Sequence, residues 1–123
     1  MVGATFDFSL LARDGVPIEH YQAGQRIFVQ DDDGAVMYVV RSGRVRIMSF
    51  GTVLDMIGPG GIFGEMALID GAPRSATAIA EEACEVAVLD RDAFLRHVRT
   101  NPEFAIEVIQ LMAYRLRRMN DVL

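Results

Sequence analysis

The sequence predicts a mainly β domain, a β-roll or jelly-roll-like barrel of short antiparallel strands, followed by C-terminal α-helices. Between about residues 19 and 89, short apolar segments alternate with closely spaced turn signals, a pattern that favours a barrel or sandwich over βαβ units. From about residue 90 to 123, apolar residues recur every three or four positions, as on amphipathic helices. The length of 123 residues fits a single domain, 1–123, with one modest core.

The strand-rich part follows a weakly helical or irregular lead-in that ends at about Ile18. QRIFVQ alternates until DDDG interrupts it, and AVMYVVRSGRVRIMSFGTVLDMI predicts two or three strands. Arg41-Ser42-Gly43 predicts a hairpin turn in which glycine supplies a positive φ, and Gly51-Thr52 and GPGG predict two further turns. In CEVAVLD, Cys84, Val86 and Val88 alternate with Glu85 and Ala87, so we expect Cys84 to be a small core residue.

Two helices are predicted after the strands. Asp90 is a suitable N-cap for RDAFLRHVR, on whose surface we expect His97. Asn101-Pro102 then begins a helix of about 20 residues, with asparagine at the cap and proline in the first turn. The other face of this second helix carries Arg115, Arg117 and Arg118. Its predicted apolar stripe consists of Ala105, Val108, Ile109, Met112, Leu116, Met119 and Leu123.

Composition and charge exclude several classes of protein. The net charge of −5 argues against direct binding to duplex DNA, which requires a basic face. A single cysteine cannot form an intramolecular disulfide, which fits a cytoplasmic setting. No apolar run approaches the roughly 20 residues that span a bilayer, and the N-terminal residues do not have the pattern of a signal peptide.

The chemistry of a binding site is concentrated in GPGGIFGEMALIDGAPRSATAIA, residues 58–80. The planar guanidinium of Arg74 suits two oxygens of a phosphate, and the small Ser75 beside it can add donors. A helical turn that starts at Glu65 would present N–H groups to an anion. The Glu65 carboxylate itself suits a sugar hydroxyl. From residue chemistry alone, a Glu65–Arg74 ion pair that pins the loop is an equal alternative.

FGEMALIDGAPRSATA closely resembles the phosphate-binding cassette of the cyclic nucleotide-binding domain family, roughly F-G-E-[LM]-A-L and then P-R-[AST]-A-[ST]. The preceding AGQRIFVQDDDGAVMYVVRSGRVRI resembles the β-roll signature of that family, and the resemblance extends from about Tyr21 to the end of the final helix. The family usually has glycine at the position of Asp31, so we expect a tighter or differently turned first loop. The matching cassette residues are Phe63, Gly64, Glu65, Met66, Ala67, Leu68, Pro73, Arg74, Ser75, Ala76 and Thr77.

The resemblance implies a role for each site residue. Glu65 would accept a hydrogen bond from the ribose 2′-hydroxyl, and Arg74 would pair with the cyclic phosphate. Ser75 and backbone N–H groups of the cassette would assist, and the base would lie against the roll. In the family the following helix often closes over the base as a lid, so Tyr114 or Arg115 is a lid candidate; a solvated helix face is the alternative for Arg115. The predicted ligand-binding residues are Phe63, Gly64, Glu65, Met66, Ala67, Arg74, Ser75, Ala76, Val45, Ile47 and Arg115.

The function implied is a non-enzymatic sensor with no cofactor or metal, in which cyclic AMP repositions the C-terminal helix. Cyclic GMP remains open, because a hydroxyl after the arginine contacts the guanine amino group in some members. We expect the helix to contact a second copy or a downstream effector. The alternatives are a regulatory domain excised from a larger channel, kinase or transporter, and a degenerate domain used for protein–protein contact. An enzyme on a β-barrel would need converging metal ligands, and the only histidines are His20 and His97.

Overall fold

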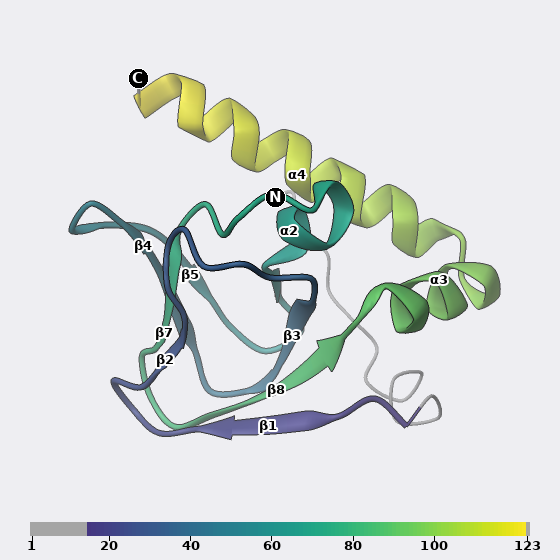
Figure 1. The fold of residues 1–123 in the computed structure, drawn as a ribbon, viewed down its shortest axis with the longest axis horizontal. Helices are drawn as coiled ribbons and strands as arrows, with labels where there is room; N and C mark the ends of the chain where they lie inside the picture. Colours follow the sequence, from purple (N-terminus) through teal and green to yellow (C-terminus); the bar gives the residue numbers. More distant parts are fainter. Residues whose placement is uncertain (1–14, 123) are drawn as a thin grey trace.

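The computed structural model describes residues 15–122. In this part of the chain, antiparallel strands form two sheets and helices cover one of them (Figure 1). The predicted class, mainly β with C-terminal helices, is confirmed. The described strands form two separate sheets of a roll rather than one closed barrel. Most of the predicted N-terminal lead-in lies outside the described residues, and β1 begins at Ile18.

Within residues 15–122, each sheet contains four strands, and the strand order mixes distant parts of the chain. The first sheet is, in spatial order, β1 (Ile18–Tyr21), β8 (Cys84–Leu89), β3 (Met37–Ser42) and β6 (Ile62–Phe63). The second sheet is β2 (Arg26–Phe28), β7 (Thr77–Ala80), β4 (Val45–Ser49) and β5 (Thr52–Ile57). The described helices are α2 (Glu65–Asp70), α3 (Arg91–Thr100) and α4 (Glu103–Val122).

The turn at Gly43 connects the two sheets. The glycine has a φ of 78°, as predicted, and a Cβ at this position would lie 2.3 Å from the Ala83 carbonyl oxygen. The predicted hairpin is wrong, however, because β3 and β4 belong to different sheets. The hairpin occurs one turn later, where Ser49 and Thr52 pair across Phe50 and Gly51, and both turn residues have positive φ, of 50° and 78°.

The described residues form two apolar core clusters, one on each face of the first sheet, and this produces three layers: sheet, sheet and helices. Because successive strand residues point to opposite faces, the four consecutive residues Met37 to Val40 are all buried, alternately in one cluster and the other. Cys84 is in the core, as predicted, and so is Ala87, on the helix side. Between the sheets lie Tyr38, Val40, Val45, Ile57, Phe63, Ala78, Ala80, Cys84 and Val86.

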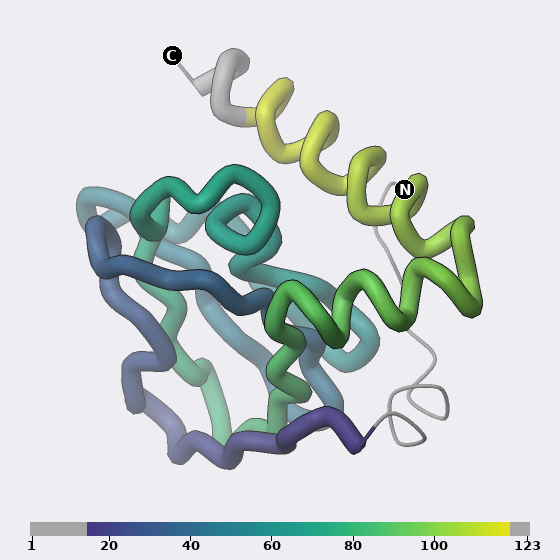
Figure 2. Tube along the Cα trace, turned by 45° about the vertical axis from the view of Figure 1, so that its right-hand side comes forward, coloured from purple at the N-terminus to yellow at the C-terminus, as the bar shows by residue number. Residues whose placement is uncertain are grey.

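Helix α3 begins where the sequence predicts. The Asp90 side chain accepts a hydrogen bond of 2.8 Å from the backbone N–H of Ala93 and so caps the helix. The prediction that His97 is a surface residue is wrong, since only 2% of it is exposed. Helix α4 folds back onto α3 (Figure 2), and the ring of Phe104 packs edge-on against His97 with 4.7 Å between ring centroids.

The buried face of α4 is rotated from the predicted stripe. Phe104, Val108 and Leu111 face the core, whereas Ile109 and Leu116 are 59% and 46% exposed. Helix α4 has apolar residues on two faces, and three- and four-residue spacing alone does not show which face packs. No helix in the described residues is both long enough and apolar enough to cross a membrane.

Candidate functional site

The cassette forms where β6 leads into α2 and where the chain approaches β7. Gly64 precedes the helix with a φ of 75°, and a Cβ there would lie 2.8 Å from Nη1 of Arg74. Gly71 ends the helix with a φ of 70°, and its N–H donates to the Ala67 carbonyl at 3.0 Å. Glycine at both ends therefore confines α2 to six residues, Glu65–Asp70, and the predicted helical turn that starts at Glu65 is confirmed.

Arg74 is buried against the roll, with 4% of its surface exposed. Its Nη1 donates to the Gly64 carbonyl and its Nη2 to the Val36 carbonyl, each at 2.9 Å. The guanidinium carbon lies 4.2 Å from the centroid of the Phe28 ring and 5.6 Å from that of Tyr38, which are favourable cation–π distances. These contacts fix the guanidinium in one orientation.

No described carboxylate forms an ion pair with Arg74, and its Nε is a buried donor without a hydrogen-bond partner. Burial lowers the pKa of Arg74, because removing the cation from water is unfavourable. Carbonyl oxygens satisfy two nitrogens of the group but do not neutralise its charge. An anion bound beside Nε would supply the missing acceptor and a directly bonded negative charge, in addition to the weaker attraction from Glu65 and Asp32.

Glu65 is also buried, with 2% exposed, but it pairs with another arginine. Its Oε1 accepts a hydrogen bond of 2.5 Å from Nη1 of Arg115 in α4. Nη2 of Arg115 donates to the Ile62 carbonyl at 2.7 Å and lies 3.7 Å from Oδ2 of Asp55 in β5. The structure therefore shows a Glu65–Arg115 pair in place of the alternative Glu65–Arg74 pair, and Arg115 is not on a solvated face.

The other predicted site residues differ in their burial and in their contacts. Phe63 stacks on Tyr38 with a centroid distance of 4.9 Å. Val45 is fully buried between the sheets, while Ile47 on the same strand is partly exposed. Tyr114 is 39% exposed and its ring lies 5.7 Å from the guanidinium of Arg118. Met66 is partly exposed, Ser75 is exposed, and Ala67 and Ala76 are buried.

No role was predicted from the sequence for Gly34 or Asp55. In the structure, each of them lies against one of the two site arginines. Gly34 lies against Nε of Arg74, and Asp55 pairs with Arg115. An acidic residue on a predicted strand and a glycine in a polar loop are both common, so neither position carries a distinctive local signal. Asp31, the departure from the family pattern, has a φ of 73°, the left-handed conformation that favours glycine.

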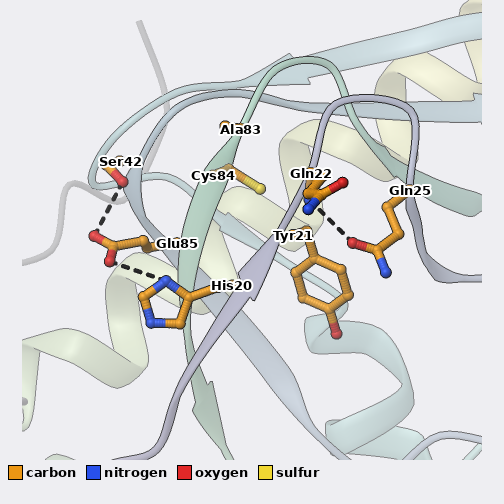
Figure 3. Close-up of a pocket in the computed structure, with 8 residues that line it drawn as sticks. All are labelled: His20, Tyr21, Gln22, Gln25, Ser42, Ala83, Cys84 and Glu85. Carbon is orange, nitrogen blue, oxygen red and sulfur yellow. Dashed lines mark hydrogen bonds and ion pairs between the residues drawn. The ribbon is translucent and has the colours of Figure 1, made fainter.

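Away from the cassette, a hollow of about 560 Å³ lies beside Ser42, the last residue of β3 (Figure 3). Within it, Glu85 pairs with Nδ1 of His20 at 3.1 Å and accepts a hydrogen bond of 3.2 Å from the Ser42 hydroxyl. A serine nucleophile needs the histidine between the serine and the acid, whereas here the acid lies between the other two. Burial raises the pKa of the Cys84 thiol in the wall, which makes it a poor nucleophile.

Sequence comparison finds a matching family model and several relatives of the chain. The family model of the cyclic nucleotide-binding domain matches residues 18–101. The chain is 40% identical over 102 residues to the cyclic AMP receptor protein of Thermus thermophilus, covering 79% of this chain and 47% of that protein. It is 42% identical over 72 residues to a cAMP-dependent protein kinase regulatory subunit of Yarrowia lipolytica, covering 58% of this chain and 19% of that protein.

Solved structures show the same similarity in three dimensions. The crystal structure of the catabolite activator protein of Thermus thermophilus matches with a TM-score of 0.79 and 38% sequence identity, covering 91% of this chain and 55% of that chain. The chain thus spans about half the length of this relative, and a fifth of the kinase subunit.

Proposed function

The chain belongs to the cyclic nucleotide-binding domain family, and on that premise we propose that it is a cytoplasmic, non-enzymatic sensor of cyclic AMP, with cyclic GMP as the alternative ligand. The cyclic AMP receptor protein and the cAMP-dependent kinase subunit among its relatives support cyclic AMP. We regard residues 1–123 as one regulatory domain. The effector would be a separate protein or a further part of a longer one.

The buried guanidinium of Arg74 carries this proposal. A cyclic nucleotide bears a single negative charge on its phosphate, and a phosphate oxygen at Nε would satisfy the donor that has no described partner. The ribose beside this phosphate offers a hydroxyl donor, and Glu65 is the nearby carboxylate suited to accept it. Ser75, exposed next to Arg74, is available to a guanine amino group, so cyclic GMP remains the alternative.

Helix α4 is connected to the cassette by packing as well as by charge. Leu68 of α2 shares an apolar cluster with Val108 and Leu111 of α4, and α2 lies beneath α4 in both views (Figures 1 and 2). A ligand that shifts α2 would therefore shift the population of α4 positions, since packed interfaces have discrete arrangements. In this way the sensor would transmit occupancy to its effector.

The test is isothermal titration calorimetry with cyclic AMP and cyclic GMP on the wild type and on Arg74→Ala. Arg117→Ala is the matched control, because Arg117 is an exposed arginine on α4. We expect the wild type and the control to bind, and Arg74→Ala to lose most of the affinity. Absence of binding by the wild type would contradict the sensor function. Equal binding by Arg74→Ala would contradict the assigned site.

The exposed face of α4 supports a macromolecular partner. Ile106, Ile109 and Leu116 are 49%, 59% and 46% exposed and recur at three- and seven-residue intervals, the spacing of a helix–helix seam. We assign this face to a second copy of the chain, with an effector domain as the alternative. Light scattering after gel filtration should show a dimer for the wild type and a monomer for Ile109→Glu. If the wild type is monomeric at all concentrations, a second copy of the chain is excluded as the partner of this face.

A further inference from the structure

Glu65 is inaccessible in this structure. Only 2% of the residue is exposed, and its Oε1 is bonded to Nη1 of Arg115. A ligand hydroxyl cannot reach a carboxylate this deeply covered unless a neighbouring group moves away. If Glu65 accepts a hydrogen bond from the ribose, as the proposed function requires, the movement of a covering group must be part of binding.

Arg115 is the neighbour best able to move. The chain neighbours of Glu65 are fixed in the core: Phe63 and Ile62 are each 1% exposed, and Leu68 is 6% exposed. Arg115 has a long side chain that is 20% exposed, and it lies beyond Leu111 and Met112, the last described residues of α4 that pack in or against the core cluster. Displacing Arg115 alone would nevertheless leave a buried carboxylate without its cation, which is a large cost.

Asp55 offers a second position for the same cation. Its Oδ2 lies 3.7 Å from Nη2 of Arg115, while its Oδ1 accepts the N–H of Met56 at 2.9 Å. A charge-assisted hydrogen bond is about 2.7–2.9 Å long, so a shift of about 1 Å would complete it. The Asp55 side chain is 30% exposed against 2% for Glu65, so an Asp55–Arg115 pair would be more hydrated than the Glu65–Arg115 pair.

We propose that Arg115 is exchanged between two carboxylates, bonding Glu65 without ligand and Asp55 once the ribose 2′-hydroxyl occupies Glu65. Arg115 and Asp55 are then positioning residues that set how strongly binding depends on the 2′-hydroxyl. The cation stays within a few ångströms of Glu65 in both states, so the buried charge is never left alone. Because Arg115 is part of α4, the exchange also couples occupancy of the ribose site to the position of that helix.

The test compares cyclic AMP with 2′-deoxy cyclic AMP by calorimetry on the wild type, Arg115→Gln, Asp55→Asn and the double variant. Arg115→Gln should bind cyclic AMP about threefold to tenfold more tightly, the scale of one hydrogen bond no longer displaced. Asp55→Asn should weaken cyclic AMP binding by a similar factor, and only where Arg115 is present. Neither variant should change the affinity for the 2′-deoxy ligand. Arg117→Gln, an exposed arginine of the same helix, is the control.

The outcomes separate this proposal from a merely structural role. Equal changes for both nucleotides, weaker cyclic AMP binding by Arg115→Gln, or additive effects in the double variant would each overturn the exchange. Absence of binding by the wild type would instead overturn the sensor function on which the exchange rests. Asp55→Asn leaves the Glu65–Arg115 pair intact. Even if Arg115→Gln does not fold, the ratio of the affinities of Asp55→Asn for cyclic AMP and 2′-deoxy cyclic AMP provides the test.

Discussion

Gly34 and Arg74 are in such close contact that no side chain fits between them. A Cβ at Gly34 would lie 2.3 Å from Nε of Arg74 and 2.6 Å from its guanidinium carbon. The Nε atom is also the buried donor that has no described partner. The backbone at Gly34 therefore helps to set the position of the guanidinium edge to which we assign the phosphate.

Gly34→Ala should weaken cyclic AMP binding, because the added methyl group pushes the guanidinium off its two carbonyl acceptors. Overpacking of this kind costs about 1–3 kcal/mol, so we expect the affinity to fall at least about fivefold. Calorimetry measures the change. Gly58→Ala is the matched control, since a Cβ at Gly58 meets nothing within 4 Å. Unchanged affinity in Gly34→Ala would show that the position of Nε does not matter.

Arg74→Ala and Glu65→Ala should differ in size and in ligand dependence. Loss of Arg74 removes the cation opposite the phosphate and should cost about 2–5 kcal/mol of binding free energy. Loss of Glu65 removes the acceptor for the ribose hydroxyl, together with the partner that Arg115 has without ligand. Its cost to binding should be smaller, and 2′-modified nucleotides should become less disfavoured. Titrations of both variants with cyclic AMP and its 2′-deoxy analogue measure these costs. A larger loss in Glu65→Ala would reverse the assigned roles.

Asp31→Gly should be more stable than Asp33→Gly by about 1 kcal/mol, because only Asp31 is in the left-handed region, with a φ of 73°. Both substitutions remove one charge from the same exposed acidic run, so the charge effect largely cancels. Urea unfolding followed by circular dichroism gives the two free energies. Equal stabilities would mean that Asp31 carries no backbone strain.

Asp90→Ala should lower the free energy of unfolding by about 1 kcal/mol, the usual contribution of an N-cap. The Asp90 side chain accepts the N–H of Ala93 at 2.8 Å, and alanine leaves that donor unpaired. Asp90→Asn retains an acceptor oxygen and should be close to wild type in the same urea titration. If the two variants lose equal stability, the loss comes from the charge and not from the cap.

Much of the site was predictable because its parts are local in the sequence. Glu65 and Arg74 belong to one contiguous cassette, and the short helix between glycines follows from backbone conformations at Gly64 and Gly71. The cap at Asp90 and the turn at Phe50 and Gly51 depend on residues only a few positions apart. The burial of His97 could not be predicted in this way, because it depends on how α4 folds back over α3.

The class of the fold was predictable from the sequence, and so was the contiguous cassette motif to which we assign Glu65 and Arg74, since both depend on local patterns. Tertiary structure decided that Gly43 joins two sheets and that Gly34 lies against Arg74. It also decided that Glu65 pairs with Arg115, 50 residues away in the chain. Such contacts arise only when distant segments pack together, so no local spacing encodes them. Glu65 and Arg74 therefore do not pair with each other, because each contacts residues outside the cassette.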